Sequence, residues 1–409
     1  MRFLAASFLR GARDEISRST RSSMSRKQAP PSRIRKQLPR RKVVFLLHSV
    51  LGGGTERVLL TLLRHLSRRD FEFHVAALLA DPQFLSALPQ DVTPHSLRAQ
   101  RLRYVLPELV RLIWKIRPHV VLSSGSGMNQ ALLTARPFLP ARLRFVVRES
   151  TTLSADLLHH RNHPKLQGFL CRWLYGRADA VICPSDSIAD DLVEHFQLSR
   201  GKLVRICNPV DVAQLHELAE TPISPYSGPG PHVVAVARLA REKGLDVLIN
   251  AIGLARLHSP NIELTLVGAG PVEYELRAQA NHLGLSQAVR FLGFQPNPWP
   301  YMRHADLFVL PSRYEGLSNA LLEALALGTL VVATDCPSAI RDVRATNPEL
   351  RLVPPDDPIR LAQAIVAACK PMERPRIAVN QEPARLARFN LQSAVEAYSA
   401  LLRGATLCR

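Results

Sequence analysis

The stretch Ala305-Asp-Leu-Phe-Val-Leu-Pro-Ser-Arg-Tyr-Glu-Gly-Leu-Ser-Asn-Ala-Leu-Leu-Glu-Ala-Leu-Ala-Leu-Gly328 carries the clearest structural pattern of this 409-residue chain. Its first part is an apolar run that ends at Pro311, which is typical of a strand buried in a parallel sheet. A polar loop follows, and a helix is predicted from Ser318, whose hydroxyl suits the N-cap position, to Gly328. A strand, a loop and a helix in this order form the repeating unit of an α/β domain.

The same alternation recurs on both sides of this stretch. Buried strands are predicted at 43–48, 73–79, 120–123, 145–147, 180–183 and 204–207, and again at 232–237, 263–267, 289–292, 307–310 and 330–333. Helices are predicted at 56–66, 245–258, 272–283, 319–327, 359–369 and 391–402. The pattern predicts an α/β protein with two doubly wound parallel-sheet domains, whose ligands should lie beyond the carboxyl ends of the strands.

A Pro- and Gly-rich segment separates the two sets of strands. Residues 222–231 hold four prolines and two glycines, which is typical of a linker. The predicted units are a basic, disordered N-terminal extension (1–42), an N-terminal Rossmann-like domain (43–211), a linker (212–231), a C-terminal Rossmann-like domain (232–385) and a segment with the last helix (386–409).

The net charge of +19 is unevenly distributed. Taken alone, it suggests a polyanionic partner such as nucleic acid or an anionic membrane. Residues 1–42 hold 13 basic and 2 acidic residues, residues 43–211 hold 21 and 14, and residues 212–409 hold 19 and 18. The positive charge therefore belongs to the N-terminal half, and a translation start at Met24 would leave this asymmetry in place.

Several common types of site are absent from the sequence. The six cysteines form no CxxC pair, which favours buried thiols in a reducing compartment. No Asp-x-Asp, HExxH or Walker A loop occurs, so we expect no metal or other cofactor. No run of 18 apolar residues occurs either, so no membrane span is predicted, and the first ten residues do not resemble a signal peptide. The adjacent Asp190 and Asp191 are predicted to lie at the surface of a helix.

Two glutamates of the quoted stretch are candidate ligand-binding residues. Glu315 lies in the loop before the predicted helix, and Glu323 lies in its second turn among alanine and leucine. A buried carboxylate needs hydrogen-bond partners, and sugar hydroxyls are suitable donors. The free amides of residues 316–319 at the start of the helix could bind a sugar or a phosphate. The spacing leaves open the alternative that both glutamates are exposed.

Cations and glycines follow other predicted strands. Arg238 and Lys243 lie between a strand and a helix, where they could neutralise a diphosphate, although solvated loop charges are the alternative. Gly268 and Gly270 form a glycine turn after a strand, which suits a loop that contacts a nucleotide.

A glycine-rich turn, Gly52-Gly-Gly-Thr-Glu56, follows the first strand and opens a helix. Such a turn lets the backbone approach an anion at the helix N-terminus. A plain strand-to-helix turn capped by Thr55 is the alternative.

These residues together resemble a known family. Glu315 and Glu323, with seven residues between them, resemble the E-x7-E motif of retaining glycosyltransferases of the GT-B fold, family four, and the residues around them are similar to that family's signature. Four further elements agree in order and spacing, at 52–56, 238–244, 267–270 and 293–298. The resemblance covers residues 43–402 and implies two Rossmann-like domains that face a cleft, with the last helix crossing back to the N-terminal domain.

The resemblance also implies roles for individual residues. The implied catalytic residues are Glu315, Arg238 and Lys243. The implied donor-binding residues are Glu323, which would hold the ribose, and Gly316, Leu317, Ser318, Asn319, Gly268, Gly270 and Gly293. The implied diphosphate and acceptor loop comprises Gly53, Gly54, Thr55, Arg148 and Glu149. Many members carry a histidine near a strand end of the N-terminal domain, where this chain has Val147-Arg-Glu-Ser-Thr151.

The implied activity is that of a metal-independent, retaining hexosyltransferase without a protein nucleophile. Residues 232–385 would bind the nucleotide sugar, with a UDP-sugar favoured, and residues 43–211 would bind a lipid-linked or polysaccharide acceptor. We expect a cytoplasmic protein, peripheral on the inner face of the membrane, because each Lys or Arg near anionic lipid contributes ~1 kcal/mol. The alternatives are a nucleic-acid-binding protein, for which no recognised module is present, and a non-catalytic scaffold, against which the intact glutamates argue.

Overall fold

A computed structural model describes residues 39–49, 53–79, 82–97, 104–160, 164–221, 224–228, 230–370 and 386–404, which belong to one compact unit that begins at Pro39. The predicted disorder of residues 1–38 lies outside the described residues. Strand β1 begins at Arg41, two residues before the predicted start of the first domain. The four predicted boundaries between the five units otherwise stay predictions.

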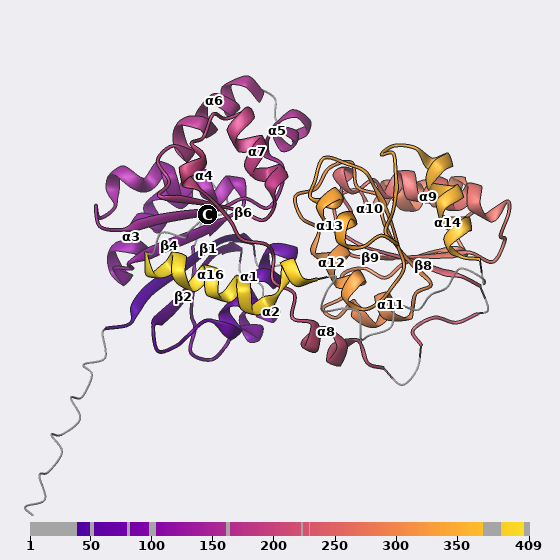
Figure 1. The fold of residues 1–409 in the computed structure, drawn as a ribbon, viewed down its shortest axis with the longest axis horizontal. Helices are drawn as coiled ribbons and strands as arrows, with labels where there is room; N and C mark the ends of the chain where they lie inside the picture. Colours follow the sequence, from indigo (N-terminus) through magenta and orange to yellow (C-terminus); the bar gives the residue numbers. More distant parts are fainter. Residues whose placement is uncertain are drawn as a thin grey trace, which may run out of the picture. The chain divides into compact units, whose positions relative to one another are not determined.

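The first sheet has seven parallel strands in the order β3-β2-β1-β4-β5-β6-β7 (Figure 1). Its strands are β1 (Arg41–Ser49), β2 (Phe71–Leu79), β3 (Thr93–Ser96), β4 (Val120–Ser124), β5 (Arg144–Arg148), β6 (Ala180–Cys183) and β7 (Leu203–Arg205). The helices of this half are α1 (Gly54–His65), α2 (Pro82–Ala87), α3 (Val105–Ile116), α4 (Ser126–Ala135), α5 (Leu153–His160), α6 (Pro164–Tyr175), α7 (Asp186–Glu194) and α8 (Val212–Ala219).

The second sheet has six parallel strands in the order β10-β9-β8-β11-β12-β13. Its strands are β8 (His232–Val236), β9 (Glu263–Val267), β10 (Val289–Phe291), β11 (Leu307–Leu310), β12 (Val331–Thr334) and β13 (Arg351–Val353). The helices that follow are α9 (Leu245–Arg256), α10 (Glu273–His282), α11 (Trp299–His304), α12 (Asn319–Ala326), α13 (Ile340–Thr346), α14 (Pro358–Ala368) and α16 (Leu391–Arg403), with short 3₁₀ turns at Arg241–Lys243 and Ala387–Phe389. The predicted fold class of two Rossmann-like, doubly wound domains is confirmed.

Each sheet is covered by apolar side chains on both faces. Along β1, Val44 and Leu46 belong to one core cluster, whereas Val43, Phe45 and Leu47 belong to the other. This division follows from the two-residue period of a strand, which sends successive side chains to opposite faces. Burial on both faces explains why the central strands are continuous apolar runs and could be located in the sequence.

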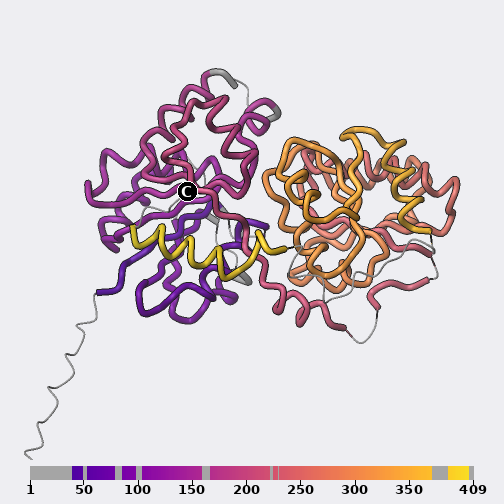
Figure 2. Tube along the Cα trace, viewed as in Figure 1, coloured from indigo at the N-terminus to yellow at the C-terminus, as the bar shows by residue number. Residues whose placement is uncertain are grey.

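The last helix packs on the first sheet, as predicted. The helix is the yellow segment that lies against the N-terminal half in Figure 2. Its buried residues Tyr398 and Leu402 share a core cluster with Phe45 of β1 and Phe73 of β2. Arg144 of β5 also donates a hydrogen bond to the carbonyl of Leu401. The helix ends at Gly404, whose φ of 86° is the left-handed conformation that favours glycine.

Other expectations were wrong or incomplete. Edge strands β3 and β13 were not predicted, because they lack a long apolar run. The predicted linker contains helix α8, which contributes Leu215 and Ala219 to a core cluster. Asp191 is buried rather than at the surface, since it accepts hydrogen bonds from the backbone amide and the hydroxyl of Ser154.

Candidate functional site

The predicted donor-site residues lie on loops at the carboxyl edge of the second sheet. Residues 237–243 follow β8, residues 268–270 follow β9, Gly293 follows β10 by one residue, and residues 311–318 follow β11. Because all these strands are parallel, their carboxyl ends meet at the same edge. The fold therefore gathers residues that are about 80 positions apart in the sequence.

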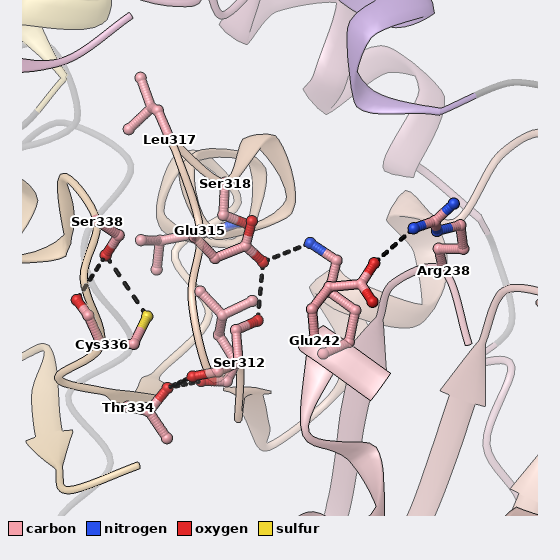
Figure 3. Close-up of polar contacts among 12 residues, drawn as sticks. Arg238, Glu242, Ser312, Glu315, Leu317, Ser318, Thr334, Cys336 and Ser338 are labelled. Carbon is pink, nitrogen blue, oxygen red and sulfur yellow. Dashed lines mark hydrogen bonds and ion pairs between the residues drawn. The ribbon is translucent and has the colours of Figure 1, made fainter. Parts of the chain in front are cut away.

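The carboxylate of Glu315 lies between a cation and a hydroxyl. Its Oε1 atom is 2.7 Å from Nζ of Lys243 and 2.8 Å from Oγ of Ser312 (Figure 3). Glu315 is only 7% exposed, so the alternative of a surface glutamate is wrong. Thr334 of β12 donates a hydrogen bond to the carbonyl of Ser312 and so fixes the position of Ser312.

The start of helix α12 presents free backbone donors next to this carboxylate. Ser318 is the N-cap, as predicted, and its hydroxyl accepts a hydrogen bond from the amide of Leu321. Within the described residues, the amides of Gly316, Leu317 and Ser318 donate to no partner. Glu315 and these three residues line a small pocket together with Leu310, Leu321, Ser338 and Ile340. The pocket itself has room for about one water molecule, so a larger ligand would have to contact the free amides and the carboxylate from outside it.

Arg238 and Lys243 come from the same loop, and each is paired with a carboxylate. Nη2 of Arg238 lies 2.6 Å from Oε1 of Glu242 (Figure 3), and the Arg238 side chain is 65% exposed. Burial opposes ionisation of Glu242, yet the hydrogen bond from Arg238 helps to hold the pKa of Glu242 below its ordinary value. Most of the Arg238 guanidinium is therefore accessible to a ligand at this edge.

The second glutamate, Glu323, is buried as well, which again contradicts an exposed position. Nη1 of Arg57 contacts both of its oxygens, at 3.1 and 2.8 Å, and the indole nitrogen of Trp299 donates to Oε2 at 3.1 Å. The Arg57 guanidinium also lies 5.3 Å from the centre of the Trp299 ring. Its partners in the described structure are thus an arginine of α1 and a tryptophan of α11.

The glycines after β9 allow two loops to approach each other. A Cβ atom on Gly268 would lie 1.9 Å from the carbonyl oxygen of Ala237, and one on Gly270 would lie 2.2 Å from that of Leu239. The amide of Gly268 donates to the carbonyl of Gly293, whose φ is +68°. Close packing of the loops thus explains these glycines, while their contact with a nucleotide stays a prediction.

The glycine turn before α1 reaches the start of α12. Gly53 is the N-cap of α1 and no side chain caps the helix, so the interpretation of Thr55 as the cap was wrong. The carbonyl of Gly54 accepts a hydrogen bond of 2.7 Å from Asn319. Asn319 in turn accepts one of 2.7 Å from Asn208. Gly52 lies outside the described residues.

Arg148 and Glu149 are buried in the interior of the first half. Arg148 donates to Asn208 and to Ser124, and it is 3% exposed. Glu149 is fully buried and accepts hydrogen bonds from Asn129 and Tyr175, while burial raises its pKa to about 7. Neither side chain offers a surface to an acceptor in this structure, and their acceptor role stays a prediction.

Three residues of this site were not predicted from the sequence: Arg57, Asn208 and Trp299. Arg57 lies in the first turn of the helix that the glycine turn opens, and Asn208 follows β7 at the carboxyl edge of the first sheet. Their positions beyond a strand end could have marked them as candidates. Trp299 had no such signal, because it follows a loop of Pro and Asn rather than a strand.

Two family models match the chain, one on each half. The model described as "Glycosyltransferase Family 4" matches residues 52–214, and the one described as "Glycosyl transferases group 1" matches residues 230–370.

Curated relatives agree with these matches. An N-acetylgalactosamine-N,N'-diacetylbacillosaminyl-diphospho-undecaprenol 4-alpha-N-acetylgalactosaminyltransferase of Campylobacter jejuni is 30% identical over 74% of this chain and 83% of its own length. The lipopolysaccharide core biosynthesis mannosyltransferase LpcC of Rhizobium leguminosarum is 32% identical over 54% of this chain and 62% of its own length.

Solved structures share the architecture. Anabaena HepE in complex with UDP-glucose has a TM-score of 0.72 at 21% identity and covers 89% of this chain and 100% of its own. The apo form of the lipopolysaccharide outer core galactosyltransferase WaaB has a TM-score of 0.62 at 17% identity, over 89% and 99%. Two Rossmann-like sheets with loops gathered at the carboxyl ends of the strands are the GT-B architecture that these structures share. Together with the family models and the Campylobacter relative, this shows that the chain belongs to the family-four glycosyltransferases.

Proposed function

We propose that this glycosyltransferase moves a hexose or N-acetylhexosamine, with retention of configuration, from a UDP-sugar to a lipid-linked or polysaccharide acceptor. The observation that carries the proposal is the bond between Lys243 and Glu315 beside the free amides that precede α12. A carboxylate, a cation and free amides in one place can recognise a sugar and the phosphate attached to it.

The two cations of the β8 loop would stabilise the leaving group. Breaking the bond between a sugar and a diphosphate places negative charge on the departing oxygen, and fixed positive charges lower the energy of that transition state. Arg238 offers a mostly exposed guanidinium, whose fork suits phosphate oxygens. Lys243 offers a point charge, of which the Glu315 carboxylate holds one donor and leaves the others available.

The carboxylates and amides would hold the two ends of the donor. Glu315 and the amides of residues 316–319 would bind hydroxyls of the transferred sugar. Glu323 would accept hydrogen bonds from the ribose hydroxyls. The diphosphate would lie between these two sets of contacts. The departing oxygen and the incoming acceptor hydroxyl would then share one face of the sugar, so that no protein nucleophile is needed. The positive charges of Arg238 and Lys243 would take the place of a metal.

The acceptor and its location are proposed from three observations. The Campylobacter relative is named for a diphospho-undecaprenol substrate, and the Rhizobium relative for lipopolysaccharide core synthesis. Residues 43–211 carry 21 basic and 14 acidic residues, which favours an anionic surface as a partner. Among the described helices, none is long and apolar enough to cross a bilayer. We therefore propose that the protein binds peripherally to the cytoplasmic face of the membrane.

Replacement of Lys243 tests the proposal. The wild-type chain and Lys243→Met would be assayed for transfer from a panel of UDP- and GDP-sugars, and we expect the variant to lose about 100- to 1,000-fold in kcat. Arg241→Met is a matched control, because Arg241 lies in the same turn but is exposed and uses only its carbonyl in the described contacts. If the wild-type chain turned over no nucleotide sugar, or if both variants behaved alike, the proposal would be wrong.

A further inference from the structure

Five large apolar side chains are exposed on the two neighbouring helices α5 and α6, four of them on α6. Leu158 of α5 is 71% exposed, and on α6 Leu166 is 68%, Phe169 68%, Leu170 42% and Trp173 51% exposed. The two helices contact each other (Figure 1). We call these five side chains the α5–α6 face.

The spacing on α6 shows that this face is a stripe rather than a scatter. Positions 166, 169, 170 and 173 are separated by three, one and three residues, so they fall on one side of the helix. The other side carries Cys171, Leu174 and Tyr175, all of which belong to the core of the first half. Helix α6 is thus apolar on its buried side and on much of its exposed side, which is typical of a surface that something else covers.

Two arginines lie beside the stripe, and the last residue of the stripe is a tryptophan. Arg172 is exposed on the neighbouring side of α6, and the guanidinium of Arg177 lies 3.5 Å from the centre of the Trp173 ring. Tryptophan favours the boundary between lipid chains and headgroups, and arginine binds phosphate through its fork of donors. This combination matches a monolayer of anionic lipid, which presents phosphates above hydrocarbon.

We propose that the α5–α6 face enters the headgroup region of an anionic bilayer and holds the first half of the chain on the membrane. The choice of a bilayer rests on the proposed function, because a lipid-linked acceptor has to be met where its lipid lies. A second copy of the chain is the less suitable occupant, since two surfaces of residues 43–211 with an excess of seven positive charges would repel each other. Insertion of a few apolar side chains beside cations is how interfacial helices bind.

A double variant tests whether the α5–α6 face binds lipid, and it leaves the net charge of the protein unchanged. The full-length chain and Phe169→Ser/Trp173→Ser would be sedimented with vesicles of phosphatidylethanolamine and phosphatidylglycerol. The substitutions leave the net charge at +19, so the basic N-terminal residues contribute equally in both proteins. We expect the variant to bind at least about tenfold more weakly, because each aromatic side chain loses its contact with the lipid. The control is Leu257→Ser/Tyr274→Ser, which removes two even more exposed large side chains from the second half.

Tryptophan fluorescence distinguishes insertion of the α5–α6 face into the bilayer from adsorption of the protein to the bilayer surface. Vesicles should shift the emission of the wild-type chain, and Trp173→Phe should abolish that shift while it keeps the binding. Equal binding of the α5–α6 and control variants, or no vesicle binding by the wild-type chain, would overturn the proposal. So would a wild-type dimer that the α5–α6 variant converts to a monomer, since a second copy would then cover the face. Transfer to a water-soluble acceptor is measured separately: loss of vesicle binding with retained transfer supports the face, whereas absence of transfer counts against the proposed function alone.

Discussion

Nη1 of Arg57 bridges the two carboxylate oxygens of Glu323, at 3.1 and 2.8 Å, although the residues are 266 positions apart. With the bond from Trp299, three donor contacts already reach this carboxylate, which offers about four acceptor positions. Two ribose hydroxyls need two of these positions. Donor binding at Glu323 would therefore require that at least one of these three contacts be given up, and Arg57 makes two of them.

Replacement of Arg57 should consequently tighten donor binding. In Arg57→Met, the ribose no longer competes with a charged hydrogen bond, and we expect the dissociation constant for UDP in calorimetric titration to fall about three- to tenfold. Arg64→Met is the control, because Arg64 is an exposed residue of the same helix α1. Weaker binding by Arg57→Met would instead show that Arg57 itself contacts the nucleotide.

The positions of the central strands and the two glutamates illustrate what the sequence could reveal. Central strands such as β1 and β11 are apolar on both faces, and the stretch from Pro311 to Asn319 carries a recognisable spacing. The edge strands β3 and β13 lack this signal because they are short and most of their residues are exposed or only partly buried. The partners of Glu323 could not be predicted, because Arg57 of α1 and Trp299 of α11 meet it only in the folded chain. Likewise, nothing local indicates that Glu149 is buried.

A chain of side-chain amides connects the two halves of the site and should be sensitive to a change of one atom. Arg148 donates to Asn208, Asn208 donates to Asn319, and Asn319 donates to the carbonyl of Gly54. Arginine can only donate and a carbonyl can only accept, so the orientation of both amides is fixed. Asn208→Asp cannot donate to Asn319, and if Asn319 rotates to compensate, the bond to Gly54 is lost.

We therefore expect Asn208→Asp to lower kcat and to destabilise the chain by about 1–3 kcal/mol, with little change in UDP affinity. Steady-state kinetics, urea unfolding and calorimetry would measure the three quantities. The control is Asn281→Asp, whose exposed side chain acts as an acceptor and loses nothing when it becomes a carboxylate. Unchanged kcat at normal stability would mean that the relay does not position the glycine turn.

Two glycines should respond in opposite directions to the same substitution. A Cβ atom on Gly316 would lie 2.1 Å from the carbonyl oxygen of Ser150, a backbone atom that cannot move alone. A Cβ atom on Gly253, within helix α9, would meet only Leu285 at 3.6 Å. We expect Gly253→Ala to raise the free energy of unfolding by about 1 kcal/mol through helix propensity. Gly316→Ala should reduce both stability and transfer. Equal melting temperatures of the two variants would contradict this steric explanation.

Glu149 should give the protein a stability that declines as the pH rises. Burial raises its pKa to about 7 from an ordinary value of 4.5, so the folded chain keeps a proton that the unfolded chain releases. Its contribution is complete below about pH 4.5 and is lost as the pH passes through about 7, with a total of about 3 kcal/mol. Urea unfolding at about pH 5 and about pH 8 should reveal this decline.

Glu149→Gln provides the decisive comparison, because the amide is neutral at every pH and its oxygen can still accept from Asn129 and Tyr175. The variant should lose much of the decline between the two pH values and be the more stable protein at about pH 8. Glu194→Gln, at an exposed carboxylate, should keep the wild-type slope. A slope unchanged by Glu149→Gln would mean that Glu149 is ionised in the folded protein. The hydrogen bonds from Tyr175 and Asn129, together with the charge of Arg148, favour the ionised form and would then outweigh burial.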